Sequence, residues 1–308
     1  MENTDVTATE ARPRDVTTVD LSTVNMGYET DGTAEGTPLF LLHGFPDTAA
    51  TWDGVVDHLP TSDLFIVRPH IRGHGLTRIH PGKTVSAETA ALATDVIELA
   101  DSLGLDSFHI VGSDWGCRAA YALAGLAPGR VRSMVTLGTG YNEATPVSDL
   151  SLDQVSSFWY QWLFQTEHGR ELLQDNRGEF CRHLWGKWSP EWEFSDQDFA
   201  EVATAIENDQ FVDTVLHYYR YRWRNAPITE QYKDAQRLVD GMPAITVRTT
   251  HIQGMEDHCT RPDTARRWEA RVTGQYRRVD LAGIGHFPQR EVPERVAAEI
   301  LRTIRGEA

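Results

Sequence analysis

The sequence predicts an α/β fold with a mostly parallel sheet, interrupted by a helical insertion. Short apolar runs alternate with helical patterns in the first half of the chain and again near its end. Such alternation is typical of a parallel sheet with helices on both faces. Between residues 143 and 237 the chain is rich in helix formers and aromatic residues, without a clear strand pattern. One sheet with a helical lid inserted between its two halves is the simplest account.

Residues 16–142 are expected to form the first half of the core. The polar segment before them, residues 1–15, is predicted to be a flexible tail. Continuous apolar runs such as residues 38–42 predict strands that are buried on both faces. The predicted strands occupy residues 16–24, 25–30, 38–42, 64–67, 108–111 and 131–137, and the predicted helices occupy 49–59, 87–103 and a segment that begins at 118.

The alternation resumes after the insertion. Residues 143–237 are expected to be a helical cap, and residues 238–308 the second half of the core. The predicted elements of that second half are strands at 244–252 and 276–281, a helix from about residue 262 and a closing helix at 292–304.

Composition excludes several classes of protein. The net charge of −16, from 29 basic and 45 acidic residues, argues against a nucleic-acid or anionic-membrane partner. The three cysteines are widely spaced, which argues against a disulfide framework or a zinc site and favours a reducing compartment. No signal-peptide pattern and no bilayer-length apolar run is visible. We therefore expect a cytoplasmic monomer or homodimer that uses no metal and no cofactor.

The most informative segment is Gly112-Ser113-Asp114-Trp115-Gly116, between a predicted strand and a predicted helix. In a nucleophile elbow the chain turns so tightly that the positions two before and two after the nucleophile must be small. Gly112 and Gly116 meet this need around Asp114, whereas a central Ser113 would have the bulky Trp115 as one flank. Asp114 is thus the predicted nucleophile. An ordinary helix N-cap is the alternative role of an aspartate at this point.

An aspartate at an elbow implies a particular chemistry. A serine needs a base to remove its proton, whereas a carboxylate is already a nucleophile. Its anion is favoured at a helix start, where N–H groups lack partners. Asp114 could displace a leaving group at an sp³ carbon, which would leave an ester that water must later break.

An elbow nucleophile also needs a base, and an acid that orients the base. His286 follows the last predicted strand within Ala282-Gly283-Ile284-Gly285-His286-Phe287, where a loop returns to the top of the sheet. We predict that His286 is the base. His74, in a glycine turn, and His217, in the lid, are weaker candidates.

The acid is expected after the penultimate strand. Asp257 lies at a suitable offset past that strand, and Glu256 stands next to it. Glu143, just past the strand that ends at Leu137, is the more serious rival, because an acid there could also reach the base. We favour Asp257.

The chain order Asp114, Asp257, His286 matches the nucleophile, acid and base order of the α/β-hydrolase fold, which this sequence resembles on both sides of the lid. His43-Gly44-Phe45-Pro46 resembles the loop that supplies a backbone N–H to the oxyanion hole of that family. The resemblance implies that the backbone N–H groups of Phe45 and Trp115 form this hole and hold a tetrahedral intermediate.

Within that family the sequence is most similar to the epoxide hydrolase branch. His43-Gly44-Phe45-Pro46-Asp47 together with Asp114-Trp115-Gly116 carries the resemblance, and the branch opens an epoxide with its aspartate while lid tyrosines donate hydrogen bonds to the ring oxygen. Residues 158–165 resemble its first tyrosine segment, which implies Tyr160 as a donor. His217-Tyr218-Tyr219-Arg220 resembles the second and implies Tyr219.

The tyrosine assignment leaves alternatives open. Tyr218 and Tyr221 are close enough in sequence to replace Tyr219, and tyrosines of an aromatic lid can simply pack. The residues expected to line the site of a small apolar epoxide are His43, Phe45, Trp115, Gln161 and Phe287.

A haloalkane dehalogenase is the second interpretation, since it shares the aspartate and the tryptophan after it. The asparagine that often supplies its second halide donor is absent from residues 43–46. Fluoroacetate-type dehalogenases have a basic residue where Trp115 stands. A third interpretation, a catalytically silent binder, would be expected to have a broken triad. Departures from the epoxide hydrolase pattern are Ser113, where histidine is common, and residues 69–72.

Overall fold

The structure is a computed structural model that describes residues 15–143 and 145–307. The predicted tail lies almost wholly outside the described residues. A nine-stranded sheet has the order β1-β2-β4-β3-β6-β7-β8-β9, with β5 paired to β2. Its strands are β1 Thr17–Asp20, β2 Val24–Gly32, β3 Thr37–Leu42, β4 Leu64–Pro69, β5 Arg78–Ile79, β6 Phe108–Ser113, β7 Val131–Leu137, β8 Thr249–Gly254 and β9 Tyr276–Leu281.

The sheet is mostly parallel, as predicted. Strands β4, β3, β6, β7, β8 and β9 run parallel, whereas β1, β4 and β5 pair with β2 in antiparallel register. Leu42 of β3 is level with Gly112 of β6. The loops after these two strands therefore leave the sheet side by side, which brings the segment after Leu42 to the elbow.

Helices cover both faces of the sheet. The described helices and 3₁₀ turns of the core are η1 Ala49–Trp52, α1 Asp53–Val56, α2 Thr89–Ser102, α3 Trp115–Leu126, η2 Pro128–Arg130, η3 Val147–Asp149, α10 Lys233–Asp240, α11 Pro262–Arg266, η5 Glu269–Arg271, α12 Pro288–Glu291 and α13 Pro293–Arg305. Helices α1 and α13 contact each other on one face, and α2, α3 and α10 contact one another on the other face.

The side chains of β3 show how the core is divided. Leu39 and Leu41 join the cluster under α1 and α13, whereas Phe40 and Leu42 join the larger cluster under α2 and α3. This alternation follows from the two-residue period of a strand. It explains why the strand reads as a continuous apolar run.

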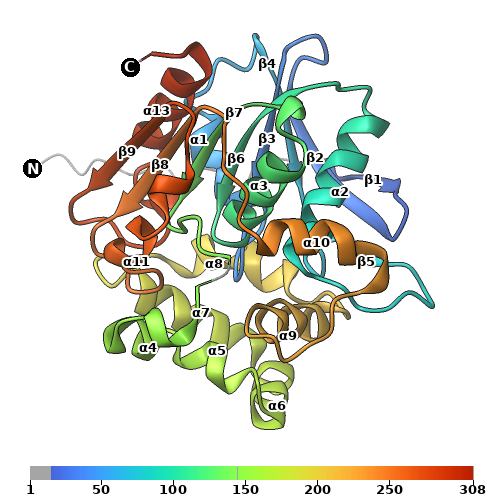
Figure 1. The fold of residues 1–308 in the computed structure, drawn as a ribbon, viewed down its shortest axis with the longest axis vertical. Helices are drawn as coiled ribbons and strands as arrows, with labels where there is room; N and C mark the ends of the chain where they lie inside the picture. Colours follow the sequence, from blue (N-terminus) through green and yellow to red (C-terminus); the bar gives the residue numbers. More distant parts are fainter. Residues whose placement is uncertain (1–14, 144, 308) are drawn as a thin grey trace, which may run out of the picture.

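The described residues of the predicted lid form helices joined by loops, without a strand, and they gather at one end of the sheet, below it in the view of Figure 1. Its elements are α4 Leu152–Ser157, α5 Trp159–Leu163, α6 Glu167–Asp175, α7 Arg177–Trp188, α8 Asp196–Ala205, α9 Phe211–Arg222 and η4 Glu230–Tyr232. The predicted boundary at residues 237 and 238 falls inside α10, which packs on α2 and α3.

Three predicted elements were wrong in extent. The strand expected at 16–24 ends at Asp20, and Val24 already belongs to β2. The helix expected at 49–59 is a 3₁₀ turn followed by a single α-helical turn that ends at Val56, and Pro60 follows soon after. The strand expected at 244–252 begins only at Thr249, because its pairing with β7 starts at the pair of Met134 and Thr249. Ile245, which was expected in this strand, makes an isolated bridge to Val272.

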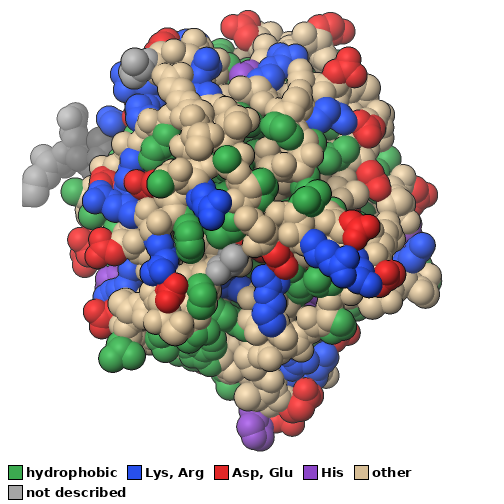
Figure 2. All heavy atoms as spheres, viewed as in Figure 1, with side chains coloured by type: hydrophobic (Ala, Val, Ile, Leu, Met, Phe, Trp, Pro, Cys, Tyr) green, Lys and Arg blue, Asp and Glu red, His purple; other side chains and the backbone are tan. Residues whose placement is uncertain are grey.

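Acidic and basic side chains are interspersed over the face shown in Figure 2. Within the described ranges, no helix has both the length and the apolar character needed to cross a bilayer.

Candidate active site

Asp114 occupies the turn between β6 and α3, with φ 52° and ψ −113°. Few residues other than glycine adopt this region of backbone space, and such strain is typical of functional turns. The flanking glycines are required by close packing. A Cβ at Gly112 would collide with the backbone of Gly116, and one at Gly116 would collide with the carbonyl of Leu42.

The Asp114 carboxylate is buried and faces two different groups. The backbone N–H of Phe45 donates to its Oδ1 at 2.9 Å, and its Oδ2 lies 3.7 Å from Nε2 of His286. Trp115 begins α3, so its backbone N–H has no acceptor four residues earlier within the helix. The two expected oxyanion donors thus come from the loop after β3 and from the first turn of α3.

His286 follows β9 and is held by Asp257, which follows β8. Nδ1 of His286 lies 2.8 Å from Oδ2 of Asp257. The other oxygen of Asp257 accepts from the backbone N–H groups of Cys259 at 2.7 Å and Thr260 at 2.9 Å. The backbone N–H of His286 donates to Oγ of Ser189 at 2.8 Å, so both main chain and ring are fixed.

The charges around His286 act in opposite directions. Burial alone would lower its pKa, but the Asp257 charge, Cys259, the nearby Asp114 carboxylate and the hydrogen bond with Asp257 raise the pKa well above its usual value. The ring therefore favours its protonated form while the two carboxylates beside it are ionised.

Glu143, the rival acid, is occupied elsewhere. Its oxygens accept from Nη1 of Arg118 at 3.1 Å and from the hydroxyl of Thr89 at 2.8 Å. The geometry brings Asp114, Asp257 and His286 together and leaves Glu143 out.

Tyr160 of α5 and Tyr219 of α9 face each other over the site, with ring centroids 5.3 Å apart. The hydroxyl of Tyr160 accepts from Nε2 of Gln161 at 2.7 Å, and its Oη lies 3.7 Å from Sγ of Cys259. The hydroxyl of Tyr219 is buried and has no partner in hydrogen-bond geometry among the described residues, although Tyr160 and Trp115 lie beside it. Burial and the nearby Asp114 charge raise the pKa of Tyr219 well above its usual value, so it keeps its proton.

The neighbouring tyrosines have other tasks. Tyr218 donates to the carbonyl of Arg72 at 2.7 Å, and Tyr221 donates to Asp240 at 3.0 Å. Their protons are committed to structural hydrogen bonds, whereas that of Tyr219 is not.

The expected lining residues divide into two groups. Phe45 and Trp115 pack edge-on against Tyr219, with centroids 5.6 Å and 5.4 Å away. His43 instead holds the loop: Nδ1 contacts the carbonyl of Gly44, and Nε2 accepts from the N–H of Ile71.

The other two expected lining residues support catalytic candidates. Gln161 holds Tyr160, and Phe287 packs behind His286 with centroids 5.1 Å apart. Burial lowers the pKa of His43 to about 3, so the ring is neutral.

Sequence reasoning missed Trp188 and undervalued Cys259. Trp188 ends α7 and packs its ring 5.0 Å from His286 and 5.2 Å from Tyr160. Its position among many lid aromatics gave no signal. Cys259 lies two residues past Asp257 in the sequence, and its spacing from the other cysteines gave it no role in the site.

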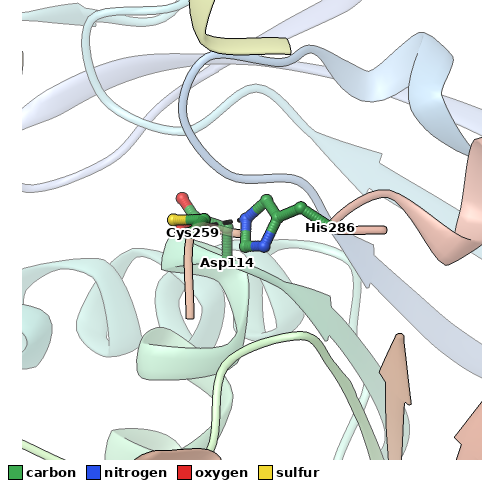
Figure 3. Close-up of side chains that lie close together, drawn as sticks. All are labelled: Asp114, Cys259 and His286. Carbon is green, nitrogen blue, oxygen red and sulfur yellow. Dashed lines mark ion pairs between the residues drawn. The ribbon is translucent and has the colours of Figure 1, made fainter. Parts of the chain in front are cut away.

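A carboxylate oxygen of Asp114, the sulfur of Cys259 and a ring nitrogen of His286 lie within 4.8 Å of one another. Figure 3 shows these three side chains together. Such a set suits a borderline-soft cation such as Zn²⁺.

Comparison with known proteins agrees with this architecture. The family model of the α/β-hydrolase fold matches residues 37–292. The chain belongs to the α/β-hydrolase fold family. This hydrolase is 26% identical to epoxide hydrolase A of Mycobacterium tuberculosis over 306 residues, which cover 88% of the chain and 91% of that relative. A match to epoxide hydrolase 2 of Siraitia grosvenorii, at 29% identity, covers 42% of the chain but only 40% of the relative.

Solved structures are similar over almost the full chain. A Klebsiella pneumoniae protein named as a candidate epoxide hydrolase superposes with a TM-score of 0.88 at 29% identity, covering 94% of this hydrolase and 97% of that chain. Epoxide hydrolase VrEH1 of Vigna radiata, at 22% identity and a TM-score of 0.76, shares the fold. The relatives agree with the epoxide hydrolase-like motifs of the sequence.

Proposed function

We propose that this hydrolase converts an apolar epoxide to a vicinal diol through a covalent ester on Asp114. The observation that carries the proposal is the placement of a buried carboxylate beneath two lid tyrosines, one of which, Tyr219, has a buried hydroxyl without a partner among the described residues. The names of the relatives support the same reaction.

In the first step Oδ2 of Asp114 attacks a ring carbon, and the bond from that carbon to the ring oxygen breaks. An alkoxide is a strong base and therefore a poor leaving group, unless hydrogen-bond donors stabilise the negative charge that develops on its oxygen. Tyr160 and Tyr219 supply O–H donors, and the proton of one of them passes to the oxygen. Gln161 donates to Tyr160, which leaves the Tyr160 proton free for this contact.

In the second step water attacks the ester carbonyl carbon and His286 takes its proton. Ester formation removes the negative charge of Asp114, which is one cause of the raised pKa of His286. The ring proton passes to the tyrosinate left by the first step, and the neutral imidazole can then accept a proton from water. Asp257 orients the ring and stabilises its charged form.

The tetrahedral intermediate places negative charge on Oδ1. Phe45 N–H already contacts that oxygen, and Trp115 N–H is the second donor. On collapse of the intermediate, the protonated His286 gives its proton to the departing diol oxygen, and the Asp114 carboxyl that results returns its own proton to His286.

One observation favours the dehalogenase alternative. The indole N–H of Trp188 is buried beside His286 and has no acceptor among the described residues, and indole donors can bind a halide. Halide leaves as a stable anion and needs no proton, so the tyrosines separate the two reactions. A silent binder is disfavoured by the assembled triad.

The test is turnover of styrene-type and aliphatic epoxides, beside chloro- and bromoalkanes, by tyrosine variants. Tyr160→Phe and Tyr219→Phe should each slow ring opening by about 10²-fold or more, the range for a lost positioned acid or oxyanion donor. Tyr218→Phe is the matched control, since its hydroxyl binds the Arg72 carbonyl, and it should retain ring opening. Halide release by the wild type that survives the double tyrosine change would contradict the proposal.

A further inference from the structure

Four arginines are buried among the described residues, and one of them differs from the rest. Arg68 pairs with Glu29, Asp31 and Asp53; Arg72 pairs with Asp95; Arg118 pairs with Glu143. Arg222 has no carboxylate within ion-pair distance in the described part of the chain. A buried charge without a counter-charge is costly, and proteins rarely retain one without a use.

The surroundings of Arg222 do not compensate its charge. Its one described polar contact is a 3.4 Å hydrogen bond from Nη1 to the amide oxygen of Asn142, and its Nε is buried without a partner. The side chain is only 8% exposed. The rings of Phe158 and Trp223 lie 5.6 Å and 4.9 Å from the guanidinium carbon, and they give a weaker attraction than a carboxylate would.

Arg222 lies one helical turn beyond Tyr219. It is three residues after Tyr219 on α9, so the two side chains share one face of that helix. Trp223 donates to Oε1 of Gln161, the residue that holds the Tyr160 hydroxyl. Burial, and the charge of Arg118, lower the pKa of Arg222 to about 9, while Glu143, Tyr160 and Tyr219 act in the opposite direction.

The one nearby carboxylate is already committed. Glu143 accepts from Nη1 of Arg118 and from the hydroxyl of Thr89, and it makes no ion pair with Arg222. Arg118 is thus neutralised by Glu143, and the guanidinium of Arg222 is the one left without a counter-charge among the buried arginines of the described residues.

We propose that Arg222 binds a carboxylate of the substrate, so that the preferred substrates are epoxides with an apolar body and one carboxylate group. This inference rests on the proposed epoxide hydrolysis for the reaction, but not for the binding of the anion. The substrate carboxylate would supply the counter-charge that Arg222 lacks, as a charge-assisted and bidentate pair.

The direct test is binding without reaction. Calorimetry would compare short aliphatic and phenyl-substituted carboxylates, such as 3-phenylpropionate, with their neutral amides. The wild type should bind at least one carboxylate about 10-fold or more tightly than its amide, and Arg222→Gln should remove that preference. Arg224→Gln is the matched control, because Arg224 pairs with Asp240 at the same end of α9 with its side chain 48% exposed.

A kinetic arm uses 3-phenylglycidate and its amide. Arg222→Gln should raise KM for the carboxylate about 10-fold or more and change kcat little, since the anion is held equally before and during ring opening. Arg224→Gln, the control outside the site, should leave the turnover of both the carboxylate and the amide unchanged.

A stability arm checks that Arg222 is not an ordinary structural arginine. Arg222→Met should leave the melting temperature unchanged or raise it, whereas Arg72→Met, which breaks a buried ion pair, should lower it by roughly 10 °C.

The outcomes are separable. The anion site would be overturned if the wild type bound every carboxylate and its amide equally, or if a preference for the carboxylate survived Arg222→Gln. In either case, tyrosine-dependent turnover of neutral epoxides would still support the proposed function. Arg222-dependent carboxylate binding without any epoxide turnover would support the anion site and contradict the proposed epoxide hydrolysis.

Discussion

At the scale of single residues, Asp114 and His286 are coupled by charge. The ionised carboxylate lies 3.7 Å from Nε2 of His286 and helps to keep a proton on the ring. Conversion of that carboxylate to an ester removes the effect. The same pair of residues can therefore serve a nucleophilic step and then a basic step without any movement of the backbone.

The acid of the triad can be tested by exchange of one carboxylate at a time. Asp257→Asn should leave ester formation largely intact and slow ester hydrolysis by about 10²-fold or more, because the ring loses its orienting anion. Glu143→Gln should change hydrolysis little, since Glu143 contacts Arg118 and Thr89. Single-turnover kinetics separate the two steps, and a reversed pair of outcomes would move the acid to Glu143.

The sequence predicted some site residues better than others, for physical reasons. The elbow is readable because a tight turn demands small residues at fixed offsets from the nucleophile. Tyr219 could not be separated from Tyr218, since adjacent residues of a helix point in directions that only packing distinguishes. Arg222 gave no signal, because a missing counter-charge is a property of the folded state.

At the scale of elements, the elbow depends on the close approach of α3 to β3. In Gly116→Ala the added Cβ would meet the backbone of Leu42. The substitution should lower the free energy of unfolding by about 1–3 kcal/mol through overpacking, and by more if Asp114 shifts. Activity should be lost, because the elbow positions Asp114.

Gly186→Ala is the matched control for that change. Gly186 lies on the exposed face of α7, where an added Cβ would meet no atom within 4 Å. The substitution should therefore stabilise the protein by about 0.5–1 kcal/mol, since alanine is the better helix former. Chemical denaturation measures both variants. A Gly116→Ala protein that is as stable and as active as the wild type would contradict the described elbow.

Element boundaries were predicted less well than element types. The strand predicted at 244–252 was shifted because its pairing with β7 starts at Thr249, and pairing partners are not visible in a single segment. Within residues 244–248 only Ile245 and Val247 are buried, so the segment has the alternation of a strand although its one bridge is the isolated pair of Ile245 and Val272.

At the scale of the whole molecule, buried neutral histidines make stability depend on pH. Burial lowers the pKa values of His43 and His74 to about 3 and that of His251 to about 4, against an ordinary value of 6.5. At pH values between the lowered pKa values and 6.5, these histidines bind protons in the unfolded chain but not in the native chain. Their contribution is complete above pH 6.5 and is lost as the pH falls toward 3, at up to about 1.4 kcal/mol per pH unit for each group.

His286 has the opposite sign, since its raised pKa contributes stability at low pH that is lost as the pH rises. Urea denaturation between about pH 7 and pH 4 should thus show steep acid destabilisation. His74→Gln should make the slope shallower by about one proton, whereas a change at the exposed His58 should not. An unchanged slope in His74→Gln would show that this ring titrates normally.

The covalent ester is the central feature of the proposed reaction, and intact-mass measurement of His286→Gln tests it most directly. His286 is needed only for the second step, so the variant should accumulate an adduct on Asp114 whose mass equals that of the added epoxide. Asp114→Asn in the same background should show no adduct. Absence of the adduct in His286→Gln, under conditions where the wild type turns the epoxide over, would contradict the two-step account.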